Sequence, residues 1–243
     1  LAVALEICGF DQVFKKVGME PTGDPFNSLM KLENTDSSPY NPMINAGAIV
    51  VASCLASEIS FDTMLDTIRA LCMDPDINLD KKVYHSEMSH ISRNRAIAYL
   101  LESKGYIEKN KDVENSLHFY VKMCSLSVTA ESLAGLGLIL ANDGIHPDTG
   151  KRLLSSQAVK IVKTLMFTCG MYDGSGEFAV RVGIPSKSGV GGGILSVVDG
   201  EMGIGIFGPA LDKKGNSVAG ECVLEYMSHE LHLHMFDPQR HTL

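Results

Sequence analysis

Apolar residues recur with helical spacing through most of the chain. In the segment 61–72, for example, Phe61, Met64, Leu65 and Ile68 are three or four residues apart, and Asp74-Pro75 follows as a stop signal. The same pattern predicts a series of further helices. They cover residues 1–17 (broken by Gly9), 43–57, 88–104, 113–123, 129–143, 155–168 and 218–234.

Two of these helices have informative sequences. Residues 43–57 are apolar on every side, so we expect a helix buried in the middle of the fold. Its uncharged run, 46–56, is too short to span a bilayer. The helix at 129–143 begins with Thr129 and carries Glu131 and Ser132, which predicts a capped, acidic first turn.

The pattern changes after Cys169. Three short segments are rich in branched residues and bounded by Gly, Pro or Asp, which is typical of strands. We expect consecutive antiparallel strands at 178–182, 194–198 and 202–207, with Asp199-Gly200 as a tight hairpin between the last two. The prediction is an α/β fold of the α+β type, in which helices flank an antiparallel sheet. We expect one domain, 1–243, with a helical subregion at 41–170 and the sheet and terminal helix at 171–243.

Composition and charge narrow the possible functions. Apolar residues make up 45% and charged residues 21% of the 243 residues, which excludes a disordered chain, a collagen and a small disulfide scaffold. The net charge is −8 and the basic residues are scattered, so we expect neither nucleic acid nor an anionic membrane as a partner. The six cysteines form no CxxC pair, which favours reduced core thiols over a zinc or redox site.

The segment 185–193 (PSKSGVGGG) is the most informative for chemistry. A Lys-Ser-Gly sequence, here Lys187 to Gly189, lines one wall of the site in serine hydrolases of the penicillin-binding and β-lactamase type. A glycine-rich hairpin with one exposed lysine fits the three residues equally well. The chain also contains one Ser-x-x-Lys match, Ser28 with Lys31, which arises easily by chance, and we expect both residues to be bystanders.

Polar residues interrupt several apolar segments. Asn45 lies at the start of the buried helix, and Glu87 and Asn94 are seven residues apart, which places them on one face if their helix is continuous. A carboxylate and an amide there would suit a zwitterion. The alternative is a solvated helix start capped by Ser86. Two tyrosines, Tyr120 and Tyr172, lie near turns, although a buried tyrosine is usually a core residue.

No metal or cofactor is predicted. His229, His232 and His234 cluster on the last helix, where a solvated chain end is the better interpretation than a ligand set. The glycines at 189–193 lack the following helix that a phosphate-binding loop requires.

Taken together, these segments resemble the serine-dependent glutaminase family, of both the bacterial and the animal kidney and liver type. Six ordered motifs carry the resemblance: residues 18–23, NPMINAGAIV at 41–50, Ser86-Glu87 with Arg93-Asn94, Phe119-Tyr120 with Cys124-Ser125, Cys169 to Asp173, and Lys187 to Val190. Because ankyrin-like repeats are absent, a compact bacterial-type member is the closer match.

The resemblance implies a β-lactamase-like fold, as in DD-peptidases. It also implies an enzyme that hydrolyses L-glutamine to L-glutamate and ammonia through a serine acyl-enzyme. It implies that Asn45, Glu87, Asn94 and Tyr120 line the substrate pocket, with Glu87 facing the α-ammonium and Asn94 and Tyr120 the α-carboxylate. The resemblance further implies catalytic roles for Tyr172, which would help to move a proton to ammonia, and for the Val190 amide, which would be half of an oxyanion hole.

The family's Gln-Ser-x-x-Lys-Pro motif would belong directly before the helix that begins at Leu1, and it is not among these residues. We therefore expect the nucleophile, the base and the N-terminal strands upstream. A β-lactamase or peptidoglycan peptidase, or a non-catalytic amino-acid-binding module, remains an alternative. The family also suggests a cytoplasmic homo-oligomer, either a dimer or a tetramer.

Overall fold

The computed structural model describes residues 1–28, 32–33, 38–109 and 112–240, and the chain divides into two units. Unit 1 comprises Leu1–Thr22, Phe26–Ala70 and Pro75–Val128, and unit 2 comprises Gly23–Pro25, Leu71–Asp74 and Thr129–Leu243. The division falls at other residues than the predicted subregions 41–170 and 171–243, and the organisation as one domain stays a prediction.

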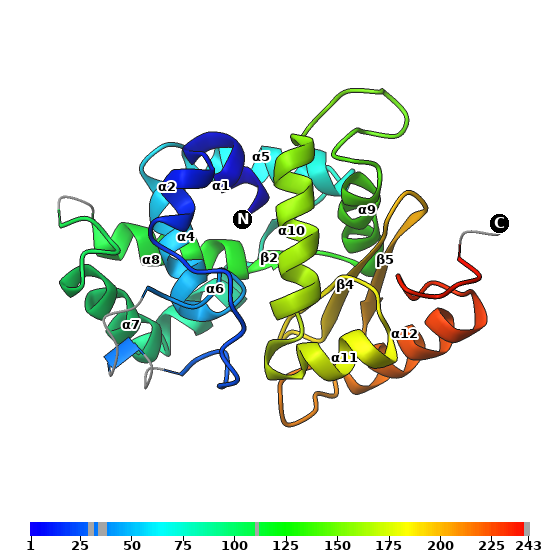
Figure 1. The fold of residues 1–243 in the computed structure, drawn as a ribbon. Helices are drawn as coiled ribbons and strands as arrows, with labels where there is room; N and C mark the ends of the chain where they lie inside the picture. The colour runs from blue at the N-terminus through cyan, green and yellow to red at the C-terminus, as the bar shows by residue number, and fades with distance from the viewer. Residues whose placement is uncertain (29–31, 34–37, 110–111, 241–243) are drawn as a thin grey trace. The chain divides into compact units, whose positions relative to one another are not determined.

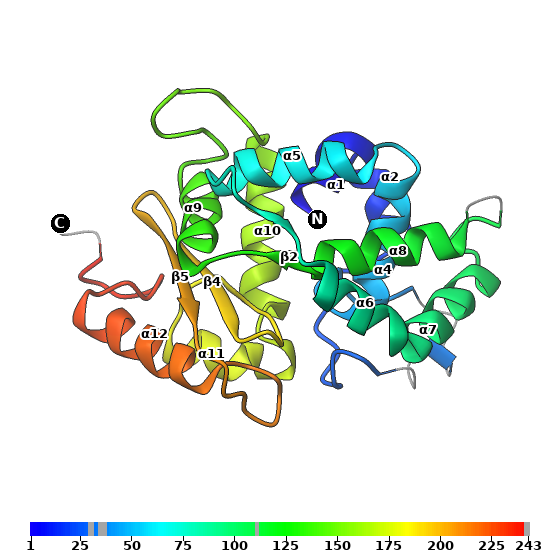
Figure 2. The same ribbon diagram turned by 180° about the vertical axis from the view of Figure 1, so that it is seen from behind.

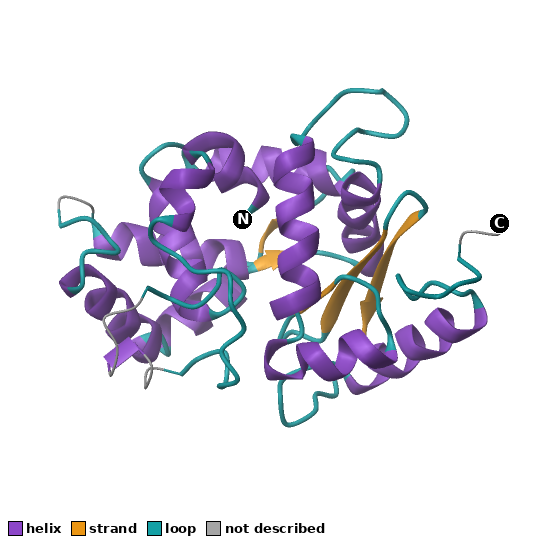
Figure 3. Ribbon diagram, viewed as in Figure 1, coloured by secondary structure: helices purple, strands orange, loops and turns teal. Residues whose placement is uncertain are grey.

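The regular structure of unit 1 is mainly helical, and the helices are joined by long loops (Figure 3). Its described elements are α1 (Ala2–Cys8), α2 (Phe10–Phe14), α4 (Asn45–Ala56), most of α5 (Phe61–Cys72), β1 (Asn78–Leu79), α6 (Lys81–Ser89), α7 (Ser92–Ser103), α8 (Val113–Cys124) and β2 (Leu126–Ser127). The predicted break at Gly9 separates α1 from α2. The two short strands β1 and β2 pair antiparallel.

Helix α4 is the buried centre of unit 1. Its residues from Ile49 to Leu55 are all buried, as the uniformly apolar sequence predicted. It packs against α7 and α8, and α6 packs against α8. Burial of a helix on all sides is favourable only because this segment carries no charge that would have to leave water. The start of α4, where Asn45 lies, is therefore fixed by apolar packing along the rest of the helix.

Unit 2 is built around a three-stranded antiparallel sheet. Its described elements are α9 (Ala130–Ala141), α10 (Ser156–Cys169), the 3₁₀ turn η1 (Tyr172–Gly174), α11 (Ser175–Arg181), β3 (Ser186–Ser188), β4 (Gly193–Val198), β5 (Met202–Phe207) and α12 (Val218–Glu230). The strands lie in the order β3-β4-β5. Helix α9 packs on β4 and β5, and α11 and α12 lie on the other face (Figures 1 and 2).

The predicted hairpin and the predicted helix cap are both confirmed. Strands β4 and β5 pair from Gly193↔Phe207 to Val198↔Met202. Residues 199–201 connect the strands at the predicted bounds, and Glu201 N donates to Val198 O at 3.0 Å across a turn with Gly200 at φ 75°. At the start of α9, Thr129 and Ser132 form a capping box.

The strand predicted at 178–182 is wrong, because these residues belong to α11 and its end. A strand would have placed Phe178, Val180 and Val182 on one face. Instead Phe178 and Val182 are buried, whereas Val180 is 80% exposed, which is helical spacing. An i,i+4 ion pair between Glu177 and Arg181 adds to the helix. The third strand of the sheet is β3, which carries the Lys-Ser pair.

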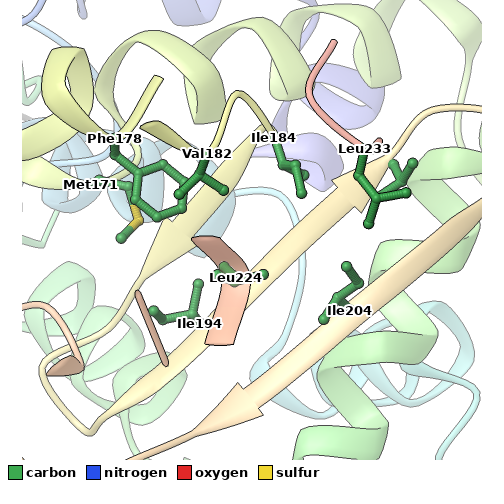
Figure 4. Packing of buried hydrophobic residues seen from close by; sticks show 9 residues of the cluster. Met171, Phe178, Val182, Ile184, Ile194, Ile204, Leu224 and Leu233 are labelled. Atoms are coloured by element: carbon green, nitrogen blue, oxygen red, sulfur yellow. The ribbon is translucent and has the colours of Figure 1, made fainter. Parts of the chain in front are cut away.

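The face of the sheet toward α11 and α12 forms an apolar cluster (Figure 4). Even-numbered residues of β4 and β5, such as Ile194 and Ile204, point into it, as strand alternation requires. Leu224 of α12 is fully buried at its centre. The full set is Met171, Phe178, Val182, Ile184, Ile194, Val198, Ile204, Leu224 and Leu233. This cluster fixes η1 and α11 against the sheet.

A cavity of about 220 Å³ opens in unit 2 beside this cluster, and its walls carry four carboxylates and two cations. Glu177 pairs with Arg181 and Lys214, and Glu225 pairs with Arg181. Burial, together with the charge of Asp212, raises the pKa of Glu221. The described part of the chain offers Glu221 no ion pair.

We expect Gly205→Ala to destabilise the protein by about 1–3 kcal/mol, because overpacking costs this much. A Cβ at Gly205 would lie 1.8 Å from the carbonyl oxygen of Ala130 in α9. The measurement is the urea midpoint. Gly176→Ala is the matched control, because a Cβ there meets nothing within 4 Å and the residue lies in α11. Equal midpoints for Gly205→Ala and the unchanged protein would contradict the packing of α9 on β5.

We expect Glu221→Gln to raise the Tm at about pH 7 and to leave it unchanged in acid. The pKa of Glu221 is higher in the folded than in the unfolded state, so its contribution to stability is present below the unfolded pKa and is lost as the pH rises through the folded pKa. At neutral pH the carboxylate is therefore a cost that the amide removes. Glu225→Gln is the control and should lower the Tm slightly, because that carboxylate pairs with Arg181. A fall in Tm for Glu221→Gln would contradict the burial of an unpaired acid.

Candidate active site

In unit 1, the structure brings Asn45 and Asn94 together. Asn45 is the first residue of α4, and its backbone N–H donates to Phe26 O at 3.1 Å. Its Nδ2 donates to Oδ1 of Asn94, in the first turn of α7, at 3.0 Å. This bond uses one N–H of the Asn45 amide and the oxygen of the Asn94 amide. Neither side chain forms another hydrogen bond within the described residues. The pair therefore keeps an amide oxygen and an amide nitrogen for a polar ligand.

The shared helical face predicted for Glu87 and Asn94 is wrong, because their helix is not continuous. Helix α6 ends at Ser89 and α7 begins at Ser92. The carbonyl of Ser86 accepts a hydrogen bond from Ser89 Oγ at 2.7 Å. It also lies 2.9 Å from His90 Nδ1, its second hydrogen-bond partner. Such local side-chain bonds compete with the helix and end it. Glu87 is an exposed residue of the last turn of α6.

Helix α6 is fixed against α8 by a contact that the sequence did not predict. The hydroxyl of Tyr84 lies 2.6 Å from Nδ1 of His118. Tyr84 precedes Glu87 by three residues, and His118 precedes Tyr120 by two. The half-buried Tyr120 is thus on the helix that holds α6 in place. The partners are far apart in sequence, so no local pattern could have indicated this bond.

In unit 2, Tyr172 has an unusual backbone. It begins η1, which follows α10 after Gly170 and Met171, and its φ is 55°. This left-handed conformation costs a non-glycine residue about 1–3 kcal/mol. Ser175 stabilises this turn, because its Oγ accepts from Met171 N at 3.0 Å and donates to Tyr172 O at 2.8 Å. The phenol of Tyr172 donates to the carbonyl of Ser188 at 3.0 Å. The strained turn therefore aims Tyr172 at the end of β3.

Val190 lies in the turn between β3 and β4. Gly189 N donates to Gly193 O at 2.9 Å and Gly192 N donates to Gly189 O at 2.9 Å, which closes the turn. The N–H of Val190 bonds no backbone acceptor among the described residues, and the residue is 52% exposed. A fixed and open N–H is what an oxyanion hole requires. The glycine-rich sequence predicted such a turn.

Lys187 points toward Tyr172. Its Nζ lies 4.5 Å from the centroid of the Tyr172 ring and donates to the carbonyl of Ser188. Lys187 is half-buried on β3, rather than the exposed lysine of a hairpin. The strand therefore brings an ammonium, a phenol and a turn with an open N–H together at one end. The sequence singled out Lys187 but not its contact with the tyrosine.

The remaining candidates contribute less. Lys31 lies outside the described residues, so the expectation for Ser28 and Lys31 stays a prediction. His229, His232 and His234 line a cavity of about 420 Å³, and His232 bonds Asp237 at 3.1 Å. Across the described ranges, no three metal-binding side chains come together.

No single described helix passes as a membrane span, although α4 and α5 together do so by length and composition, with a bend of 113°.

Comparison with known proteins identifies the family. The glutaminase family model matches residues 1–236. The glutaminase of Clostridioides difficile (strain 630) is 53% identical over 240 residues, which are 97% of this chain and 77% of that protein.

Two solved structures agree. The probable glutaminase of Bacillus subtilis has a TM-score of 0.90 and 40% identity, covering 96% of this chain and 78% of its own. A covalent complex of Bacillus subtilis glutaminase with 5-oxo-L-norleucine has a TM-score of 0.85 and 37% identity, covering 97% and 78%. The predicted mixed α/β fold of the β-lactamase-like type is confirmed. The chain belongs to the glutaminase family.

Proposed function

We propose that the protein hydrolyses L-glutamine to L-glutamate and ammonia through a serine acyl-enzyme. The observation that carries this proposal lies at the end of β3. There the Tyr172 phenol bonds the carbonyl of Ser188, two residues before Val190 and its open N–H. A proton donor beside an oxyanion donor is what hydrolysis of an unreactive amide needs. Membership of the glutaminase family supports the choice of the amide.

In the proposed reaction, a serine hydroxyl attacks the carbon of the side-chain amide while its general base takes the hydroxyl proton. This proton is relayed by way of Tyr172 to the leaving nitrogen. The carbonyl oxygen becomes an oxyanion, which the Val190 N–H stabilises. Tyr172 passes a proton to the amide nitrogen, the C–N bond breaks, and ammonia leaves. Water then hydrolyses the ester that remains. The covalent 5-oxo-L-norleucine complex of the Bacillus subtilis glutaminase supports a covalent step, since that ligand carries a ketone where glutamine has its amide.

We assign recognition of the amino acid to the residues that the family resemblance indicates. Glu87 faces the α-ammonium, and Asn94 and Tyr120 hold the α-carboxylate. Asn45 orients Asn94, since the two amides are bonded at 3.0 Å. One carboxylate with neutral donors pairs the charges of a zwitterion without a surplus, which favours a free amino acid over the anionic substrates of a β-lactamase.

The direct assay is ammonia release from L-glutamine by the full-length protein. L-Asparagine and a chromogenic cephalosporin, run beside it, separate the proposal from a different amidase and from a β-lactamase or peptidase. Binding of L-glutamate without any turnover would favour the non-catalytic module instead.

We also propose a cytoplasmic homo-oligomer, either a dimer or a tetramer. All six cysteines lie among the described residues and none of them forms a disulfide there, which supports a reducing compartment. The oligomeric state rests on the family alone. Light scattering after size exclusion measures it directly, and a monomer would contradict it.

We expect Glu87→Gln to lower kcat/KM for glutamine about ten- to a hundredfold, because a charge-assisted hydrogen bond to the ammonium contributes about 1.5–3 kcal/mol. Most of the loss should appear in KM, if ground and transition states hold the ammonium equally. The fold should survive, because Glu87 is exposed. Steady-state kinetics with a thermal melt measure both.

The matched control is Glu58→Gln, which removes an exposed carboxylate just after the far end of α4 and should change neither constant. Unchanged constants for Glu87→Gln as well would mean that Glu87 is only a solvated helix residue.

A further inference from the structure

Lys187 leaves β3 on the face opposite to its two neighbours. Ser186 and Ser188 are each 1% exposed, and Ser186 Oγ lies 2.7 Å from Ser196 Oγ of β4. Because side chains alternate along a strand, Lys187 points to the other face. Its long side chain is half-buried there, and the ammonium lies 4.5 Å from the centroid of the Tyr172 ring.

Tyr172 and Lys187 both donate hydrogen bonds to the main-chain carbonyl of Ser188. Ser188 O accepts the Tyr172 hydroxyl at 3.0 Å and also accepts Lys187 Nζ. The hydrogen bond fixes where the phenol oxygen lies but leaves the ring free to turn about it. The ammonium over the ring face fixes the plane of the ring, through its attraction to the negative face of the π system. Together the two contacts define both the position and the orientation of the phenol.

We propose that Lys187 is a positioning residue that acts on the reaction through Tyr172. This inference rests on the proposed role of Tyr172 as the group that passes a proton to the leaving ammonia. Such a phenol must exchange its partner at Ser188 O for the substrate nitrogen during the reaction. The cation over the ring holds the ring plane while the hydroxyl changes partners, and it does so without touching the substrate. Loss of Lys187 should therefore lower kcat and leave KM nearly unchanged.

The test is a double-mutant cycle with Lys187→Met and Tyr172→Phe in the full-length protein, assayed by ammonia release. Methionine keeps an unbranched side chain but removes the charge. We expect Lys187→Met to lower kcat about tenfold or more, with KM within about twofold. In the Tyr172→Phe background the same substitution should change kcat by less than about twofold, because its target is gone.

Two further variants distinguish positioning from loss of structure. Lys187→Arg should retain kcat within about threefold, because a guanidinium also stacks on an aromatic ring. Lys160→Met, which removes an exposed lysine of α10, should change nothing. Thermal melts check folding, and Lys187→Gln replaces Lys187→Met if the latter does not fold.

A second measurement needs no turnover. In protein with isotope-labelled tyrosine, the Tyr172 ring signals are assigned by their loss in Tyr172→Phe. These signals should shift in Lys187→Met, and Lys187→Arg should perturb them less.

Equal losses of kcat in both backgrounds, a loss confined to KM, or no recovery with arginine would overturn the inference while glutamine hydrolysis stands. A full-length protein that releases no ammonia from glutamine would overturn the proposed function and this inference with it. Unshifted Tyr172 signals in Lys187→Met would show that the ring–cation contact is absent.

Discussion

Within unit 2, the geometry around Tyr172 depends on how closely the end of α10 lies against β3. A Cβ at Gly170 would lie 1.8 Å from the carbonyl oxygen of Ser186, so only glycine permits this approach. At this distance Ser188 N donates to Gly170 O at 3.0 Å. Tyr172, two residues further on, then reaches Ser188 O. The bond of Tyr172 to Ser188 and the contact of Lys187 with the tyrosine ring both depend on this backbone-to-backbone contact.

In unit 1, the buried side-chain amide of Asn41 fixes the chain just before α4. Asn41 is 1% exposed, and its Nδ2 donates to Glu20 O at 2.8 Å while its Oδ1 accepts from Met43 N at 3.0 Å. These bonds hold the chain as it enters α4, so that Asn45 begins the helix with its side chain directed at Asn94. A buried amide with both ends paired is specific in direction, because any other orientation leaves a polar group unsatisfied.

Much of the fold could be predicted from the sequence where burial has a clear period. Helix α5 was predicted at its observed bounds, and the β4–β5 hairpin was predicted from its branched residues and the Asp-Gly turn. The prediction failed at 178–182, because five apolar and basic residues fit a strand or a helix equally until burial decides. It also failed between Glu87 and Asn94, where side-chain bonds to Ser86 O, rather than Gly or Pro, end the helix.

The site could be predicted only in part, and for a physical reason. Asn45 stood out because an amide at the start of an apolar helix needs a partner, and the structure provides Asn94. The glycine-rich turn of Val190 stood out because glycines let the backbone come close to a ligand. The positive φ of Tyr172, the Tyr84–His118 bond and the Lys187–Tyr172 contact left no local signal, because each joins parts of the chain whose proximity only the fold creates. The roles of Glu87, Tyr120 and Tyr172 came from the family resemblance.

In our proposal the end of β3, where the Tyr172 phenol and the open Val190 N–H lie, receives the amide end of the amino acid. An NMR titration of isotope-labelled full-length protein with L-glutamate tests this most directly, with D-glutamate as the control. We predict that the Val190 backbone amide and the Tyr172 ring signals shift together and saturate with one Kd, and that D-glutamate has a weaker effect. Binding of L-glutamate that leaves both sets of signals unshifted would contradict the proposal.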